Sequence, residues 1–167
     1  MRFDLSSAAV LALAVASALT TAWWMDKASL RGQAQAAVPV HAAASGRPAQ
    51  VPRASDGHYW AEARVDGQSV RVMVDTGASL VVLTRDDAAR LGLHPSADDF
   101  TTQVATAAGA VRAAPVRLGS IAVADARVDT VDALVVEAGL PHSLLGMSYL
   151  GRLSAFSATP AELTLRP

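Results

Sequence analysis

The chain has 167 residues, of which 51% are hydrophobic, 14 are Lys or Arg and 15 are Asp or Glu. A net charge of −1 without a basic block argues against nucleic-acid binding through a charged face. The absence of cysteine excludes disulfides, thiolate nucleophiles and cysteine-based zinc sites. His58, His94 and His142 lack the spacing of metal ligands, so we expect neither a metal nor another cofactor.

The N-terminus carries an uncharged, apolar run at residues 5–25 that closes with Trp23 and Trp24. Its length is about that needed to cross a bilayer as a helix, and tryptophans favour the membrane interface. A cleaved signal peptide is the competing interpretation, because the small residues at 16–18 offer a cleavage site. The run is longer than a usual signal-peptide core, so we expect residues 1–27 to be a single transmembrane anchor.

A flexible linker is expected next, because residues 28–56 are rich in Ala, Pro, Ser and Gln and lack apolar periodicity. The folded domain is therefore expected at residues 57–167. Its first segment, 59–65, alternates in the manner of a half-buried strand. The Asp-Gly pair at 66–67 predicts a tight hairpin turn, and a return strand follows at 70–74.

The rest of the domain reads as short strands with little helix. Thr84 has the character of a helix N-cap and Gly92 that of a C-terminal stop, which predicts a short helix between them. A helical turn is expected after Gly146. Further strands are expected at 80–83, 101–106, 111–116, 121–123, 133–136 and 162–165, with a hairpin between the second and the third. This pattern indicates a small all-β barrel or sandwich.

The tripeptide Asp75-Thr76-Gly77 joins two apolar strands, whereas an exposed turn normally sits among polar residues. Gly77 permits a tight turn, and the Thr76 hydroxyl can hydrogen-bond to neighbouring backbone. Two carboxylates brought together in such a setting share a proton. One then acts as a base toward water, and the other acts as an acid toward a carbonyl. The motif therefore suits general acid/base hydrolysis.

Residues 75–79, Asp-Thr-Gly-Ala-Ser, are followed later by Leu144-Leu145-Gly146 ahead of a helical turn. In this combination the chain resembles the retropepsin-like aspartic peptidases, in particular their single-domain, membrane-anchored bacterial members. The resemblance covers residues 58–167. It implies an all-β fold, a small closed acid-protease barrel with one or two short helices, preceded by a single transmembrane helix.

The resemblance also implies roles for particular residues. Asp75 would be the catalytic carboxylate, Thr76 would join a grip between two loops, and Gly77 would contact the substrate backbone. The other members of the active-site loop and of the supporting apolar motif are Ala78, Ser79, Leu144, Leu145 and Gly146. The flap over the substrate would be the turn of Thr106, Ala107, Ala108 and Gly109. A plain structural hairpin is the alternative there, because this turn lacks the several glycines of viral relatives.

Only one Asp-[Ser/Thr]-Gly is present, since Asp125, Asp129 and Asp132 are not followed by that pattern. About 110 folded residues leave no room for two lobes, so a carboxylate pair requires a homodimer with Asp75 of each copy at the two-fold axis. Tethering to a membrane would raise the effective concentration for this pairing.

The function expected from these features is an aspartic endopeptidase acting on a protein or peptide. The alternative is a non-catalytic, dimeric peptide-binding or assembly module of the same fold, and a purely structural Asp75 is a third possibility. The lysine and arginine count on the two sides of the anchor is nearly balanced and does not set the orientation. The resemblance implies a single-pass protein of the inner (cytoplasmic) membrane with its catalytic domain in the periplasm.

Overall fold

The computed structural model describes residues 43–106 and 109–167. The expected anchor at 1–27 and the first part of the expected linker lie outside the described residues. Within the described part of the chain, no helix is both long enough and apolar enough to cross a bilayer.

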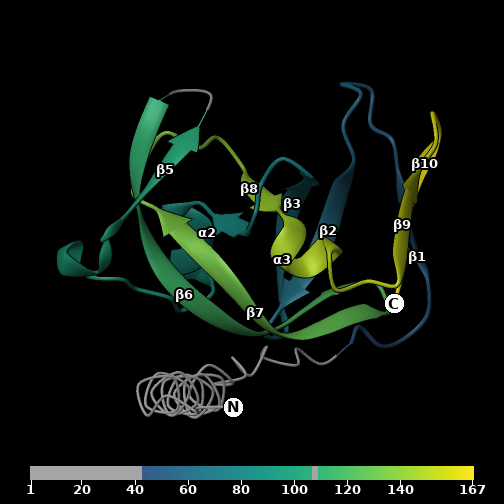
Figure 1. Cartoon of the computed structure of the whole chain (residues 1–167), viewed down its shortest axis with the longest axis horizontal. Helices are drawn as coiled ribbons and strands as arrows, with labels where there is room; N and C mark the ends of the chain where they lie inside the picture. The colour runs from purple at the N-terminus through teal and green to yellow at the C-terminus, as the bar shows by residue number, and fades with distance from the viewer. Residues whose placement is uncertain (1–42, 107–108) are drawn as a thin grey trace, which may run out of the picture. The chain divides into compact units, whose positions relative to one another are not determined.

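A closed six-strand barrel forms the body of the domain (Figure 1). Its strands, in order around the barrel, are β2 (Trp60–Val65), β3 (Gln68–Val74), β8 (Ser143–Leu145), β4 (Val81–Leu83), β7 (Ala126–Val136) and β6 (Gly109–Val123). The barrel closes because β6 also pairs with β2, with Val65 opposite Ile121. A further strand, β5 (Thr102–Thr106), pairs with the outer part of β6. The expected small, closed all-β barrel is thus confirmed.

The β2–β3 hairpin forms where the alternation predicts it. Asp66 and Gly67 both have positive φ, 48° and 90°, which a two-residue turn of this kind requires. The Asp66 carboxylate also accepts hydrogen bonds from the backbone N–H groups of Gly119 and Ser120, at 3.1 and 2.7 Å. These bonds hold β6 in register past Gly119, so the two strands predicted at 111–116 and 121–123 are one continuous strand.

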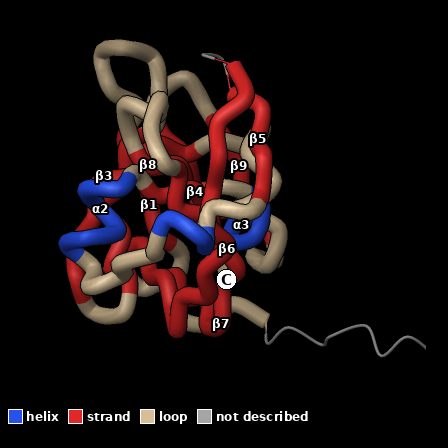
Figure 2. Tube along the Cα trace, turned by 90° about the vertical axis from the view of Figure 1, so that its left-hand side faces the viewer, coloured by secondary structure: helices blue, strands red, loops and turns tan. Residues whose placement is uncertain are grey.

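The helical segments are short (Figure 2). They are α2 (Arg85–Arg90), the 3₁₀ turn η1 (Ala97–Asp99) and α3 (Met147–Leu150). The predicted N-cap is present, because the Thr84 hydroxyl accepts a hydrogen bond from Asp87 N at 3.1 Å. The helical turn predicted after Gly146 is α3.

A separate three-stranded sheet gathers the two ends of the described chain: β1 (Ala49–Pro52), β10 (Glu162–Arg166) and β9 (Ala155–Ala158), in that spatial order. The strand β1 lies within the expected linker, so the boundary at residue 57 is wrong. Its composition resembles a linker, but Ala49 and Val51 alternate inward and lie opposite Leu165 and Leu163. Small apolar residues in strand register therefore extend the folded domain toward the N-terminus.

Two groups of buried side chains organise the interior. The larger group fills the barrel and includes Tyr149, whose hydroxyl donates to the Ala126 carbonyl at 2.8 Å. Burial raises the pKa of Tyr149 above its ordinary value, so this side chain stays neutral at physiological pH. The smaller group consists of Ala113, Leu134 and Val136, with partly buried apolar neighbours. This second group lies under the cleft described next.

Candidate active site

Asp75 follows the last residue of β3, and its position is set by the strand beside it. β3 and β8 run parallel, with Val74 opposite Leu145. The ladder continues one step further, because Asp75 N donates to the Leu145 carbonyl at 3.2 Å. The two sequence motifs, some seventy residues apart, are therefore neighbours in one sheet.

The loop after Asp75 orients its carboxylate. Gly77 N donates to Asp75 Oδ1 at 2.8 Å, and Ala78 N donates to the Asp75 carbonyl at 3.3 Å. Asp75 itself is half-buried. Among the described residues, Gly77 N is the hydrogen-bond donor to this carboxylate, and it holds Oδ1. A half-buried carboxylate fixed through one oxygen is suited to proton transfer.

Gly146 lies where the two loops meet most closely. A Cβ at this residue would lie 2.1 Å from the Leu80 carbonyl oxygen and 2.6 Å from that of Ala78. The next residue, Met147, donates its N–H to the same Ala78 carbonyl at 2.8 Å. The glycine is required here by close backbone approach and not by a positive φ, since its φ is −92°.

A cleft of about 1040 Å³ contains Asp75. Its walls are mainly apolar, and Asp75 is the only acidic side chain and His142 the only basic one among the described residues that line it. The active-site loop, β7 and the β5–β6 hairpin all contribute to its walls. A large, mainly apolar cleft with a single carboxylate suits a peptide with apolar side chains better than a charged small molecule.

The predicted site residues are distributed around this cleft. Asp75, Gly77, Ala78, Ser79, Leu144 and Thr106 line it. Thr76 is exposed and does not belong to the lining, and Leu145 is fully buried in the core. The predicted hairpin is present, with Thr106 opposite Gly109, while Ala107 and Ala108 lie outside the described residues.

The wall that β7 supplies is not predicted from the sequence. Leu134 and Val136 line the cleft, although they were expected only as part of a strand. A usable signal was the unbroken apolar run Ala133–Val136, because a strand that is apolar on both faces is covered on both faces. The tertiary structure decides which elements pack against each face of β7.

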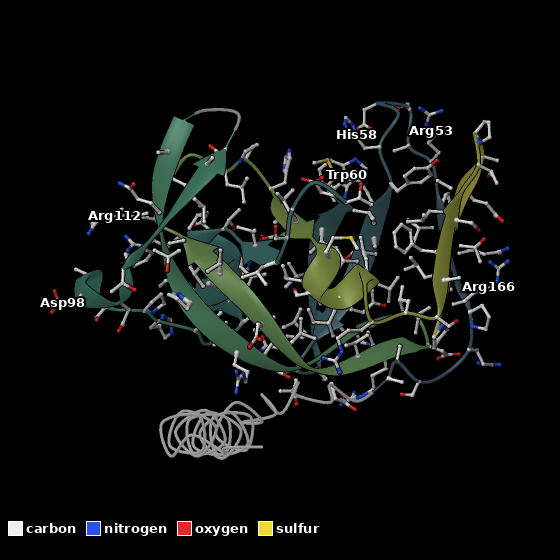
Figure 3. The ribbon with its side chains drawn as sticks, viewed as in Figure 1. Arg53, His58, Trp60, Asp98, Arg112 and Arg166 are labelled. Atoms are coloured by element: carbon white, nitrogen blue, oxygen red, sulfur yellow. The ribbon has the colours of Figure 1, made fainter. Side chains whose placement is uncertain are left out.

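His142 is a second residue whose place in the cleft is not predicted from the sequence, where its spacing from other histidines indicates no metal site. It lines the cleft and meets Trp60 edge-on, with ring centroids 4.8 Å apart. The Arg71 guanidinium lies 4.8 Å from the Trp60 ring centroid, in cation–π contact. Trp60 is fixed in turn because its Nε1–H donates to Asp56 at 2.9 Å. His142 thus joins the cleft to a rim of aromatic and charged side chains, part of which is labelled in Figure 3.

Hydrogen bonds within the loop at residues 56–60 also lower the pKa of Asp56 below its ordinary value. The hydrogen bond from His58 N, at 2.9 Å, is the main cause, followed by that from Trp60. Because the folded state favours the ionised carboxylate, its contribution to stability is present at neutral pH and is lost as the pH falls through the lowered pKa.

A buried polar network supports β8 from behind. Ser143 is fully buried and donates its hydroxyl to Asp87, which is 6% exposed. The same hydroxyl accepts from Thr84 N at 3.0 Å, and the Thr84 hydroxyl donates to Asp87 at 2.9 Å. Arg90 completes the network as an ion-pair partner of Asp87. The network ties the start of β8 to the start of α2, one residue before Leu144 enters the cleft.

Replacing Ser143 by alanine is expected to lower the free energy of unfolding by about 1–3 kcal/mol, because the buried Asp87 carboxylate loses a donor. Chemical denaturation of the two proteins measures the difference. Ser69→Ala is the matched control, since Ser69 is an exposed strand serine. Its expected effect lies within about 0.5 kcal/mol. Equal stability of the Ser143 and Ser69 variants would contradict a structural role for the network.

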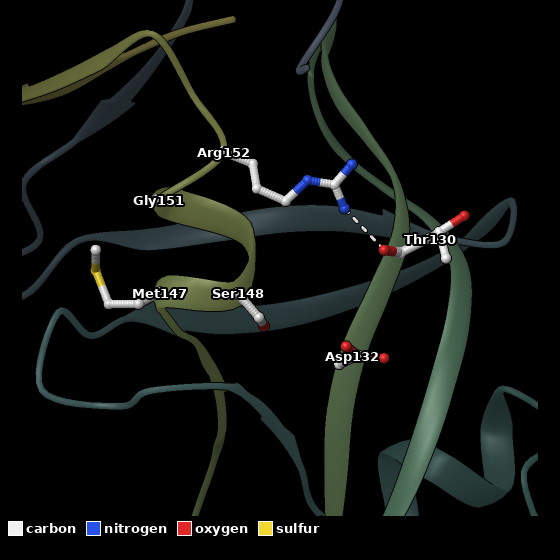
Figure 4. Close-up of a pocket in the computed structure, with 6 residues that line it drawn as sticks. All are labelled: Thr130, Asp132, Met147, Ser148, Gly151 and Arg152. Atoms are coloured by element: carbon white, nitrogen blue, oxygen red, sulfur yellow. Dashed lines mark hydrogen bonds between the residues drawn. The ribbon is translucent and has the colours of Figure 1, made fainter. Parts of the chain in front are cut away.

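A smaller pocket of about 230 Å³ lies beside α3 and does not contain Asp75 (Figure 4). Arg152 spans it, donating to the Thr130 carbonyl at 2.7 Å. Among the described residues no group of three or more His, Cys, Asp or Glu side chains is placed to hold a metal ion. The 1040 Å³ cleft is therefore the candidate site.

Two curated bacterial proteins are similar in sequence. An uncharacterized protein of Sinorhizobium is 41% identical over 112 residues, which is 66% of this chain and 48% of the relative. An uncharacterized protein of Rickettsia prowazekii is 37% identical over 106 residues, 64% of this chain and 46% of the relative. The chain thus spans about half the length of these relatives.

Solved structures agree in fold. A retropepsin-like aspartic protease from Rickettsia conorii has a TM-score of 0.65 and 34% identity, covering 73% of this chain and 92% of that one. The EIAV protease, complexed with an inhibitor, has a TM-score of 0.51 and 21% identity, covering 63% of this chain and 96% of that one, and supports the fold alone.

The family model described as gag-polyprotein putative aspartyl protease matches residues 61–152. This match includes both motifs, the six barrel strands except Trp60 at the start of β2, and the residues that line the candidate cleft. The resemblance to retropepsin-like enzymes is confirmed. The chain belongs to this aspartyl protease family and has its retropepsin-like fold.

Proposed function

We propose that the protein is an aspartic endopeptidase that hydrolyses peptide bonds of a protein substrate at a site shared by two copies of the chain. The observation that carries this proposal is the half-buried Asp75 carboxylate, oriented by Gly77 N at 2.8 Å in a mainly apolar cleft. The cleft has mainly apolar walls, as a site for an extended peptide would, and one copy of the chain supplies one carboxylate where the chemistry needs two.

The chemistry follows from two Asp75 carboxylates that share one proton. The ionised carboxylate takes a proton from water as the water oxygen attacks the peptide carbonyl carbon. The protonated carboxyl gives its proton to the carbonyl oxygen, which forms a tetrahedral diol. The carboxyl that took the water proton then gives a proton to the nitrogen as the C–N bond breaks. The other carboxylate takes a proton from one diol hydroxyl, and the diol becomes the new carboxyl group. No covalent bond to the enzyme forms at any step.

The substrate class follows from the cleft walls. Met73, Leu80, Val82 and Leu134 present apolar surface on the lining. Peptides with apolar side chains flanking the cut bond would bury that surface, and each buried side chain favours binding by roughly 1.5–3 kcal/mol. We therefore propose cleavage between apolar residues.

The test is digestion of a mixed peptide library by the purified full-length chain in water enriched in ¹⁸O. Cleavage between apolar residues with one ¹⁸O in each new carboxyl group is the expected result. Transfer of the acyl group to an added amine would indicate a covalent intermediate and contradict the mechanism. A dimer that binds these peptides and never cuts them would instead favour the peptide-binding module.

We also propose that residues 1–27 anchor the protein in the cytoplasmic membrane with the protease domain in the periplasm. The uncharged run at 5–25, closed by two tryptophans, supports this proposal. In spheroplasts, added protease is expected to degrade the domain while leaving a cytoplasmic marker intact. Protection of the domain until the membrane is broken would contradict the orientation.

A further inference from the structure

The floor of the cleft continues into a basic region on the same face of the sheet. Arg71 and Met73 in β3 and Asp75 after it occur at every second position, so they share one face. The parallel register of β3 and β8 places Arg71 beside His142, one step before the first paired residues. Met73 and His142 both line the cleft. The lining therefore leads from the carboxylate over an apolar side chain to a histidine, with an arginine beside it.

Trp60, which is labelled in Figure 3, holds the two basic side chains in place. Its ring meets His142 edge-on, and the Arg71 guanidinium lies 4.8 Å from its ring centroid. The ring is itself fixed, because Trp60 is half-buried and its Nε1–H donates to Asp56 at 2.9 Å. We call Trp60, Arg71 and His142 the basic end of the cleft.

The carboxylates near the basic end leave its donors available. Glu62 lies opposite Arg71 in the β2–β3 register, but neither Arg71 nor His142 forms an ion pair with a carboxylate among the described residues. Asp56 already accepts hydrogen bonds from within the loop at residues 56–60. Arg71 and His142 are both exposed. An arginine keeps its charge, and an imidazole has an N–H donor in either protonation state, so both can donate to an incoming anion.

We propose that the basic end binds an acidic side chain of the protein substrate, at a position outside the two residues that flank the cut bond. The guanidinium and imidazole N–H groups donate to the substrate carboxylate, and charge-assisted bonds of this kind are the stronger class of hydrogen bond. Arg71 lies about 13 Å along the strand from Asp75, which is four residues of extended chain. Because both side chains span part of that distance, we expect the acidic residue about two to four positions from the cut bond.

This inference rests on the proposed peptidase activity and deepens it, because it adds a charged determinant to the apolar residues at the cut bond. The proposed active site is shared by two copies related by a two-fold axis. Each copy therefore supplies one basic end, and the two lie on opposite sides of the cut bond. A substrate with an acidic residue on both sides satisfies both basic ends and is expected to be cut most efficiently.

Moving one glutamate along a peptide tests the proposal. A series of fluorogenic peptides with an apolar cut site carries Glu at successive positions, two to five residues from the cut bond, and each has a partner with Gln at that position. Gln has the same shape without the charge. For the full-length wild-type chain, kcat/KM is expected to be at least about fivefold higher for Glu than for Gln at one position on each side. A ratio below about twofold at every position would overturn the proposal.

Variants of the basic end test which side chains carry the preference. Arg71→Gln and His142→Gln are each expected to lower the Glu/Gln ratio at least about twofold, and together to bring it to about one. Arg85→Gln is a matched control, because Arg85 also stacks on an aromatic ring, Phe100, at 4.9 Å. His94→Gln is the second control, at an exposed histidine. Neither control residue lines the cleft, so both variants are expected to keep the wild-type ratio. A double variant that also keeps that ratio would contradict the assignment.

Binding of uncleavable peptides separates this inference from the proposed activity. Peptides with a reduced bond at the cut site, in Glu and Gln versions, are titrated with the full-length chain and followed by fluorescence anisotropy. Tighter binding of the Glu version that is lost in the double variant, without cleavage of any normal peptide, would refute the peptidase activity and support the basic end. Equal cleavage of Glu and Gln peptides would leave the peptidase activity standing and remove the basic end. Failure to bind or cut either peptide would overturn both.

Discussion

Replacing Asp75 by asparagine is expected to lower kcat/KM for peptide cleavage at least about 1000-fold, because the amide can neither take a proton from water nor share one with its partner. The fold should remain, since the amide oxygen can still accept the hydrogen bond from Gly77 N. Initial rates on a fluorogenic peptide with an apolar cleavage site measure the loss. Thermal unfolding of the same preparation reports the fold.

Asp129→Asn is the matched control for that loss. Asp129 is exposed, pairs with Arg127 and is absent from the cleft lining. The same chemical change there is expected to leave kcat/KM within about twofold of wild type. Undiminished cleavage by the Asp75 variant would contradict the assignment. Unfolding of that variant would instead favour a structural role for the carboxylate.

Mixing Asp75→Asn with an equal amount of wild type tests whether the site is shared. If each active site needs both carboxylates, random exchange of subunits should reduce the activity to about half of that given by the wild-type chains alone. Independent sites would leave the activity unchanged. The comparison needs only rates recorded before and after exchange.

Gly146→Ala has the second large expected effect. The new Cβ would lie 2.1 Å from the Leu80 carbonyl oxygen and 2.6 Å from that of Ala78. Both atoms are backbone atoms of the active-site loop, whose Ala78 carbonyl already accepts a hydrogen bond from Met147 N, so the loops must separate. We expect a loss of about 3 kcal/mol or more in the free energy of unfolding, together with loss of peptidase activity. Urea denaturation followed by tryptophan fluorescence measures the first quantity.

Gly77→Ala provides the contrast within the same pair of loops. There the nearest atom to the new Cβ is the Asp75 side-chain oxygen Oδ1 at 3.1 Å, which can shift. Stability is expected to fall by less than about 1 kcal/mol, while activity falls because the carboxylate moves. Similar stability of the two alanine variants would contradict the close backbone crossing at Gly146.

Much of the domain could be predicted because local signals agree with the fold. The Asp66-Gly67 turn requires positive φ at both positions, and Thr84 caps α2 through its own hydroxyl. The alternation in β2 and β3 marks one face as buried, and Asp75 follows directly at the end of β3. Such signals lie within a few residues of one another, so a single sequence contains them.

Other features depend on residues that are distant in the chain. β1 resembles a linker until its small residues meet Leu163 and Leu165 across a register of more than a hundred positions. β8 is three residues long, and it becomes a strand through β3 on one side and β4 on the other. Ser143 has no recognisable role until Asp87 lies beside it.

The sequence by itself determined the chemistry that this protein is suited to. A lone Asp-Thr-Gly between apolar strands, with Leu-Leu-Gly further on, indicates one half of an aspartic site. The glycine allows a tight turn, and the aspartate supplies one carboxylate of a pair that shares a proton. Only the tertiary structure decided what surrounds that carboxylate. Parallel pairing of β3 and β8 brings Asp75 to Leu145, and β7 and the β5–β6 hairpin build the cleft. Pairing between strands that are distant in the sequence positions these elements, and no short segment of the sequence identifies the strand with which it will pair.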